Sequence, residues 1–141
     1  MVKRVLAIDY GSKRIGLAIT DPLYILAQPL PYIENKGTPH ILKSLKQICA
    51  EKSVDHIIFG LPQNLDDSLG LQALRYQKIA GMLEQALKIP IEMFDERYST
   101  KEALDILIEE MDVSRKKRRE IQDSLAASLL LKSYMESHAA E

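Results

Sequence analysis

The sequence predicts one α/β layered domain, in which a mixed β-sheet carries helices on its faces. Two apolar runs joined by a short turn open the chain, and segments with helical spacing then alternate with two further apolar runs. The 141 residues are enough to bury roughly two-thirds of the unfolded surface around one core. We therefore expect a single domain over residues 1–141.

The first two apolar runs, residues 4–9 and 14–20, are predicted to pair as an antiparallel hairpin. Gly11 and Ser12 suit the turn between them, because such residues tolerate backbone angles that larger ones avoid. A third strand is expected at 26–33, where two prolines either restrict it to the edge of a sheet or interrupt it. The chain thus opens with two or three antiparallel strands.

A helix is predicted to begin at Thr38, which would cap its N-terminus, with Pro39 as the first helical residue. Apolar residues then recur at helical spacing as far as Cys49, so we expect Cys49 to lie in the core. The apolar run at 55–61 indicates a buried strand, and the turn-rich segment at 62–70 indicates a loop.

Helical spacing returns at 70–87, with Leu74, Leu83 and Leu87 among the apolar positions, and a short strand is expected at 91–94. Ser99 and Glu102 then form a capping-box pattern, which predicts a helix immediately after the strand. A last helix is expected at 115–134.

The composition excludes several classes of protein. Hydrophobic residues make up 46% and charged residues 28%, as in an ordinary globular domain. A net charge of -1 gives no global attraction for nucleic acid or an anionic membrane, so such binding needs a local basic patch. One cysteine allows no disulfide framework or thiolate zinc cluster, and the three histidines lack metal-ligand spacing. The first apolar run is too short for a signal peptide, so we expect a cytoplasmic protein with no membrane partner.

Three carboxylates stand at the ends of predicted elements. Asp9 ends the first strand, Glu96 follows the last strand, and Asp123 lies inside the last helix. Ligand sites of layered α/β sheets form at strand ends, so Asp9 and Glu96 are expected to converge. Asp123 shares a helical stripe with apolar residues that should face the protein, and a buried carboxylate there needs a cation as partner.

Oxygen ligands suit Mg²⁺ or Mn²⁺, which commonly join protein carboxylates to a substrate phosphate. Such an ion can activate water for attack on a phosphodiester, which is the chemistry of a nuclease. Each acid also has a structural interpretation, as a turn former, a helix-start residue or the partner of a surface lysine.

Basic residues accompany the three acids. Five consecutive cations begin the last predicted helix, where its dipole favours acidic residues, so their placement indicates phosphate binding. A solvated charged face is the alternative. Lys13 and Arg14 beside Asp9, and Arg97 beside Glu96, would extend the patch or simply pair with the acids. The predicted nucleic-acid contacts are Lys13, Arg14, Arg97, Arg115, Lys116, Lys117, Arg118 and Arg119.

Four segments, "IDYGSKRIGLAITD", "GLPQNLDDSLG", "FDERYST" and "SRKKRREIQDSLAASLLL", resemble in order and spacing the bacterial Holliday junction resolvase-like family, also called the YqgF family. Its members are described as nucleases for the precursor of small-subunit ribosomal RNA. The resemblance covers nearly the whole chain. It implies a ribonuclease H-like fold with a mixed five-stranded sheet and helices on both faces.

The resemblance also implies a metal-dependent endonuclease that acts on structured nucleic acid. By position, Asp9, Glu96 and Asp123 match the family's metal-binding catalytic acids, with Mg²⁺ or Mn²⁺ as cofactor. The implied substrate is precursor ribosomal RNA, cut at the 5′ end of pre-16S rRNA during ribosome biogenesis. Related resolvases have a fourth acid, whereas the fourth strand here ends in Gly60, Leu61 and Pro62, so one metal ion is favoured over two.

Three other functions stay open from the sequence. The first is a Holliday junction resolvase acting on branched DNA, and the second is a catalytically weak RNA-binding factor in ribosome assembly. The third is an ATPase of the actin or sugar-kinase type. The segment "DYGSKRIG" also resembles the phosphate-binding hairpin of those enzymes, although they need two such domains. We expect a monomer or a weak homodimer.

Overall fold

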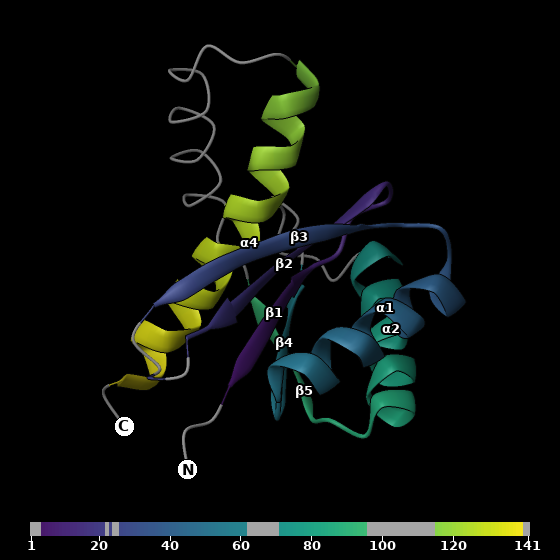
Figure 1. Cartoon of the computed structure of the whole chain (residues 1–141). Helices are drawn as coiled ribbons and strands as arrows, with labels where there is room; N and C mark the ends of the chain where they lie inside the picture. Colours follow the sequence, from purple (N-terminus) through teal and green to yellow (C-terminus); the bar gives the residue numbers. More distant parts are fainter. Residues whose placement is uncertain (1–3, 22, 24–25, 62–70, 96–114, 140–141) are drawn as a thin grey trace.

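A five-stranded mixed sheet forms the centre of the molecule, with the long helix α4 on one face and helices α1 and α2 on the other (Figure 1). The computed structural model describes residues 4–21, 23, 26–61, 71–95 and 115–139. Within these ranges the side chains of 61, 72, 95, 115–124, 138 and 139 are left undescribed. The helix expected after Ser99 lies outside the described residues.

The described elements agree closely with the predicted ranges. In chain order they are β1 (Val5–Asp9), β2 (Arg14–Thr20), β3 (Ala27–Glu34), α1 (Thr38–Lys52), β4 (His56–Leu61), α2 (Leu71–Leu87), β5 (Ile91–Asp95) and α4 (Arg115–Ala139).

The strands lie in the order β3-β2-β1-β4-β5. β1 pairs antiparallel with β2, and β2 pairs antiparallel with β3, while β4 pairs parallel with both β1 and β5. The mixed sheet predicted from the sequence is therefore confirmed. Because β1, β4 and β5 run in the same direction, their carboxyl ends lie at one edge of the sheet, where α/β proteins place their ligand sites.

β3 is a continuous strand despite its two prolines. It lies at the edge of the sheet, where a residue without an N–H donor is tolerated. Between the pairs Ile15–Ile33 and Leu17–Leu30, one residue of β2 faces two residues of β3, Pro31 and Tyr32. This β-bulge absorbs the extra residue without ending the strand.

Two hydrophobic clusters hold the helices on the sheet. Under α1 and α2, alternate strand residues such as Leu6, Ile8 and Phe59 pack with Leu45 of α1. The cluster under α4 consists of Val5, Ala7, Ala18, Ile58, Ala127, Leu130, Leu131 and Tyr134. Three of these eight are alanines, and small side chains let a helix backbone approach a sheet closely. The sequence prediction that Cys49 lies in the core is also confirmed.

The cap of α1 and the end of α4 differ from the predictions. α1 is capped by Gly37, whose φ of 103° is suited to glycine, and Thr38 is already the first helical residue with no side-chain cap. Leu74 of α2 is 53% exposed, because the stripe of α2 that faces the sheet runs through Ala73, Tyr76, Ala80 and Leu83. α4 also continues to Ala139, past the predicted end at residue 134.

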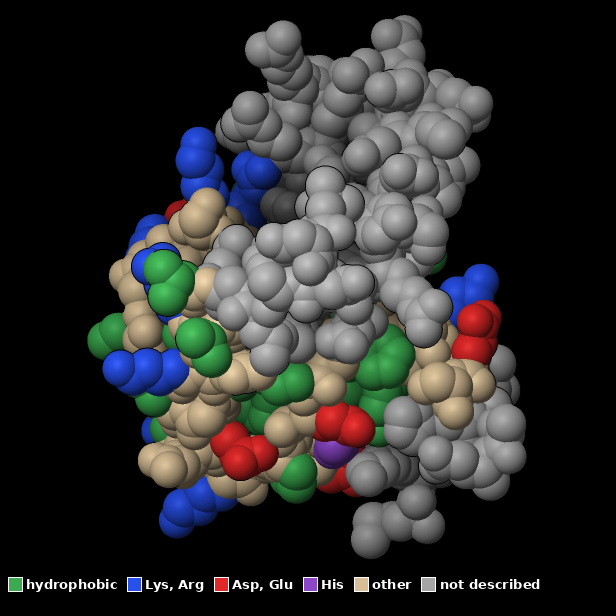
Figure 2. Space-filling model, turned by 180° about the vertical axis from the view of Figure 1, so that it is seen from behind, with side chains coloured by type: hydrophobic (Ala, Val, Ile, Leu, Met, Phe, Trp, Pro, Cys, Tyr) green, Lys and Arg blue, Asp and Glu red, His purple; other side chains and the backbone are tan. Residues whose placement is uncertain are grey.

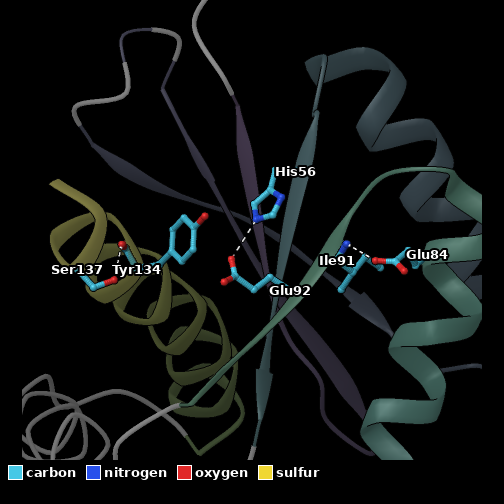
Figure 3. A network of polar contacts seen from close by, with 6 residues as sticks. All are labelled: His56, Glu84, Ile91, Glu92, Tyr134 and Ser137. Atoms are coloured by element: carbon cyan, nitrogen blue, oxygen red, sulfur yellow. Dashed lines mark hydrogen bonds and ion pairs between the residues drawn. The ribbon is translucent and has the colours of Figure 1, made fainter. Parts of the chain in front are cut away.

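A polar contact joins β4 to β5, and aromatic contacts join this place to the C-terminal half of α4. His56 of β4 lies with its Nε2 3.3 Å from a carboxylate oxygen of Glu92 on β5, and its ring stacks on that of Tyr134 at 5.9 Å (Figure 3). Tyr134 also meets the Phe94 ring edge-on at 5.7 Å. His56 therefore has the structural role expected for a histidine outside a metal site. None of the described helices is long and apolar enough to span a membrane.

Candidate active site

Asp9 is the last residue of β1, and it lies on the α4 face of the sheet. Val5 and Ala7 belong to the cluster beneath α4, and side chains alternate along a strand, so Asp9 has the same direction. The residue is half-buried. Its carboxylate thus stands at the carboxyl edge of the sheet, on the side covered by α4.

Glycines flank Asp9 on both neighbouring strands. Gly16 of β2 is its pairing partner, and Gly60 of β4 lies level with it, because the preceding residues Ile8 and Phe59 are paired. Both glycines are buried. The positions of β2 and β4 that lie level with Asp9 therefore carry no side chain.

α4 lies on the same face of the sheet as Asp9, and it packs on β1, β2, β3 and β4. Its buried stripe includes Ala127, Leu130 and Tyr134, as the sequence predicts. In the sequence, Asp123 precedes Ala127 by four residues, about one helical turn. Figure 1 shows α4 running from beyond the carboxyl edge of the sheet down across its face.

Glu96 and Arg97 lie outside the described residues. The structure does place the strand that leads to them. β5 is separated from β1 by β4 alone, which puts the two carboxyl ends about 10 Å apart. On β5, Glu92 and Phe94 face α4, and Phe94 is paired with Gly60. The chain therefore leaves β5 at the same edge as Asp9.

The turn between β1 and β2 is tight and closely held. A Cβ added to Gly11 would overlap the carbonyl oxygen of Arg14, so this position needs glycine as the sequence indicates. The turn is also bound by Asn35, which follows β3. The Asn35 N–H donates to the Lys13 carbonyl at 2.9 Å, and its Nδ2 donates to the Gly11 carbonyl at 2.9 Å.

The two predicted contact residues of this turn differ in their surroundings. Lys13 is exposed at the turn. Arg14 begins β2, and its guanidinium carbon lies 5.6 Å from the centre of the Tyr32 ring, within the range of a cation–π contact. Because Arg14 precedes Gly16 by two residues, it shares the α4 face with Asp9.

The basic run from Arg115 to Arg119 occupies the first five residues of α4, although its side chains are not described. Figure 1 shows this end of the helix extending beyond the sheet. On the face seen in Figure 2, most of the described Lys and Arg side chains lie along one side, at the left of the view. In the sequence, Arg115 to Arg119 form the longest run of consecutive cations.

The sequence patterns do not predict the contacts of Tyr32 and Asn35. Asn35 had one available signal, since it lies two residues before Gly37 at a strand-to-helix corner where asparagine often hydrogen-bonds the backbone. Tyr32 had none, because its contact with Arg14 depends on the pairing of distant strands and on the bulge in β3.

The donor chemistry of this region fits a hard divalent cation. Asp9 is an oxygen donor at a strand end whose neighbours on both sides are glycines, and Mg²⁺ and Mn²⁺ take oxygen ligands. Within the described residues no group of three or more His, Cys, Asp or Glu side chains is arranged to hold a metal ion. The side chains of Glu96 and Asp123 lie outside that set.

Comparison with known proteins agrees with this geometry. A relative from Syntrophomonas wolfei, named "Putative pre-16S rRNA nuclease", is 41% identical over 133 residues, which cover 94% of each chain. A relative of the same name from Thermoanaerobacter pseudethanolicus is 41% identical over 95% of this chain and 96% of its own.

Solved structures give the same fold at low identity. RuvC of T. thermophilus in complex with a Holliday junction substrate is 12% identical, with a TM-score of 0.58 over 96% of each chain. The fowlpox virus Holliday junction resolvase is 17% identical, with a TM-score of 0.50 over 95% of this chain and 98% of its own. These similarities confirm the predicted ribonuclease H-like fold.

The family model described as "RuvX: Holliday junction resolvase" matches residues 3–137. This match spans nearly all of the chain, and the two relatives cover it to the same extent. The chain therefore belongs to the RuvX family.

Proposed function

We propose that this protein is a Mg²⁺- or Mn²⁺-dependent endonuclease, and that precursor 16S rRNA is its substrate. Membership of a resolvase family gives the class of reaction, hydrolysis of a phosphodiester bond. The position of Asp9 carries the proposal. It ends a central strand on the face covered by α4, with a glycine level with it on each neighbouring strand.

Asp9, Glu96 and Asp123 are the proposed metal ligands and catalytic acids. Asp9 would be supplied by the end of β1, Asp123 by the N-terminal half of α4, and Glu96 by the position that follows β5. A divalent cation bound there would lower the pKa of a coordinated water and neutralise charge on the scissile phosphate. The three carboxylates would keep that cation at the sheet edge.

The basic residues have a separate role in the proposal. Lys13, Arg14, Arg97 and the run from Arg115 to Arg119 would contact the phosphate backbone on either side of the scissile bond. Such contacts fix the position of the substrate without reading its sequence. Arg14 is partly immobilised by the Tyr32 ring, which reduces the conformational entropy lost when it binds a phosphate.

RNA is preferred over branched DNA as the substrate because of the degree of similarity. The relatives that carry the pre-16S rRNA name are 41% identical to this chain, whereas the solved resolvases are 12% and 17% identical. The description of the matching family favours a four-way DNA junction as the second candidate. Cleavage at the 5′ end of pre-16S rRNA, in the cytoplasm and by a monomer or weak homodimer, belongs to the same proposal.

The test is cleavage of two end-labelled substrates, a structured RNA spanning the 5′ end of 16S rRNA and a four-way DNA junction. Each is incubated with Mg²⁺, with Mn²⁺ or with EDTA. Loss of a residue that only supports a metal ligand costs about 10–100-fold, so Asp9→Asn should lower cleavage by at least about 100-fold. Asp55→Asn, at an exposed acid outside the site, should cleave like the wild type.

The results separate the candidate functions. Faster cleavage of the RNA supports the proposal, and faster cleavage of the junction replaces it with the resolvase. Equal activity of wild type and Asp9→Asn would assign the cleavage to a contaminant or to another site. A wild type that binds RNA but cuts neither substrate would make the protein an assembly factor. The lack of an acid among Gly60, Leu61 and Pro62, at the end of the fourth strand, favours that function.

A further inference from the structure

Asn35 holds the turn that follows Asp9 by three hydrogen bonds. Its backbone N–H donates to the Lys13 carbonyl at 2.9 Å. Its side-chain Nδ2 donates to the Gly11 carbonyl at 2.9 Å and to the Tyr10 hydroxyl at 3.2 Å. The remaining atom, Oδ1, accepts the Gly37 N–H at 3.2 Å. One side chain thus connects the β1–β2 turn to the corner between β3 and α1.

Tyr10 is fixed from a second direction as well. Its ring stacks on Phe59 of β4 at 5.8 Å and meets the ring of Tyr76 of α2 edge-on at 5.0 Å. These contacts place Tyr10 on the α1 and α2 face of the sheet. Because side chains alternate along the chain here, Asp9 is directed to the opposite face, under α4.

We propose that Asn35 is a positioning residue of the active site, which sets the orientation of the Asp9 carboxylate by locking the backbone from Tyr10 to Lys13. The inference rests on the proposed nuclease function. Asn35 itself contacts neither metal nor substrate in this account. It acts through the peptide units that follow Asp9.

The turn between β1 and β2 has two proposed functions, to contact phosphate and to position the Asp9 carboxylate, and they depend differently on its geometry. The phosphate contacts proposed for Lys13 and Arg14 would depend mainly on charge, so a small shift of the turn should change them little. A metal ligand has a narrow range of productive positions, and a displacement of about 1 Å can cost about 100-fold in rate. Loss of the Asn35 contacts should therefore affect kcat and leave nucleic-acid binding nearly unchanged.

Two substitutions of Asn35 separate hydrogen bonding from charge. Asn35→Asp keeps an acceptor for the Gly37 N–H but loses both side-chain donors to the turn, and it adds a negative charge. Asn35→Ala loses the same donors and adds no charge. A matched control is Gln47→Ala on the exposed side of α1, whose amide bonds only Glu51 at 3.1 Å among the described contacts.

The measurements are kcat and KM for the structured RNA, RNA affinity in EDTA, and hydrogen exchange of the amides of residues 10–14. Both Asn35 variants should lower kcat by about 10–100-fold, with KM and the EDTA affinity within about threefold of wild type. Amide exchange in the turn should accelerate. Tyr10→Phe removes only the hydroxyl acceptor, so its kcat should lie between wild type and Asn35→Ala, and Gln47→Ala should match wild type.

Several results would overturn the inference while the nuclease proposal stands. These are an unchanged kcat in folded Asn35→Ala, a loss confined to KM or to RNA affinity, or a loss in Asn35→Asp alone, which would indicate charge repulsion. If neither Asn35 variant folds while Tyr10→Phe retains wild-type kcat, Asn35 is a folding residue and not a positioning one. If the wild type cleaves neither RNA nor DNA, the nuclease proposal fails and this inference falls with it.

Discussion

Replacing Thr20 with valine should destabilise the start of β1. Thr20 is fully buried, and its hydroxyl oxygen accepts the backbone N–H of Val5 at 2.9 Å. The Thr20 carbonyl is occupied separately, because the Arg4 guanidinium donates to it at 3.1 and 3.2 Å. Arg4 also donates to the Lys52 carbonyl at 2.9 Å, which connects this end of β1 to α1.

The expected magnitude follows from the burial of the donor. Valine has nearly the same volume as threonine, so the change removes an acceptor without opening a cavity. Val5 is 1% exposed, and a buried N–H without a partner costs about 1–3 kcal/mol. Since the free energy of unfolding of a domain is about 5–15 kcal/mol, this is a substantial fraction. The melting temperature should fall by roughly 3–12 °C.

The assay is urea unfolding followed by circular dichroism, together with hydrogen exchange of the Val5 amide. Thr20→Ser is the matched control, because it keeps the hydroxyl and loses one methyl group worth about 0.8 kcal/mol. The Val5 amide should lose protection in Thr20→Val and keep it in Thr20→Ser. A valine variant as stable as the wild type, with a protected Val5 amide, would refute the reasoning.

Two further predictions concern charge and pH. Replacing the five cations from Arg115 to Arg119 with glutamine should weaken RNA binding for all sequences alike. The slope of log binding constant against log salt concentration should also become shallower, by up to about 0.9 per lost duplex phosphate contact. An unchanged slope, measured by fluorescence anisotropy, would exclude this run from the interface. Burial raises the pKa of Cys49 from 9.0 to about 11. Between pH 9 and 11 the folded state therefore keeps the thiol proton while the unfolded chain loses it. This contribution to the free energy of unfolding is fully present below pH 9 and should decline by about 1–3 kcal/mol as the pH rises to 11. Cys49→Ala should lack this component in urea unfolding, and parallel pH curves for the two proteins would contradict it.

The regular elements were predictable because their signals are local. The apolar alternation and the turn at Gly11 define the first hairpin, and helical spacing defines α1, α2 and α4 within a few residues. The cap of α1 was assigned to Thr38 because hydroxyl residues favour that position. Gly37 takes it instead, since the chain turns from β3 into α1 with a positive φ that glycine adopts without strain.

Local sequence patterns lead to the candidate acids, whereas the contacts around Asp9 depend on long-range pairing. Asp9 stands out because it ends an apolar strand, and Asp123 because it interrupts an apolar stripe. The strand order that brings Gly16 and Gly60 beside Asp9 depends on pairing between distant segments. The contacts of Asn35 with Tyr10 and Gly11 depend on the same long-range pairing, which no local pattern encodes.

The two prolines of β3 have a consequence for how this molecule meets its own copies. An exposed edge strand presents N–H and C=O groups that can pair with another chain and seed aggregation. Pro29 and Pro31 provide no N–H, and the bulge at Pro31 and Tyr32 breaks the regular spacing along the same edge. A second copy cannot extend the sheet at β3 with a regular ladder. Among the described strands, β5 is the other edge of the sheet, so β3 protects one side of the protein against continuous sheet formation at high concentration.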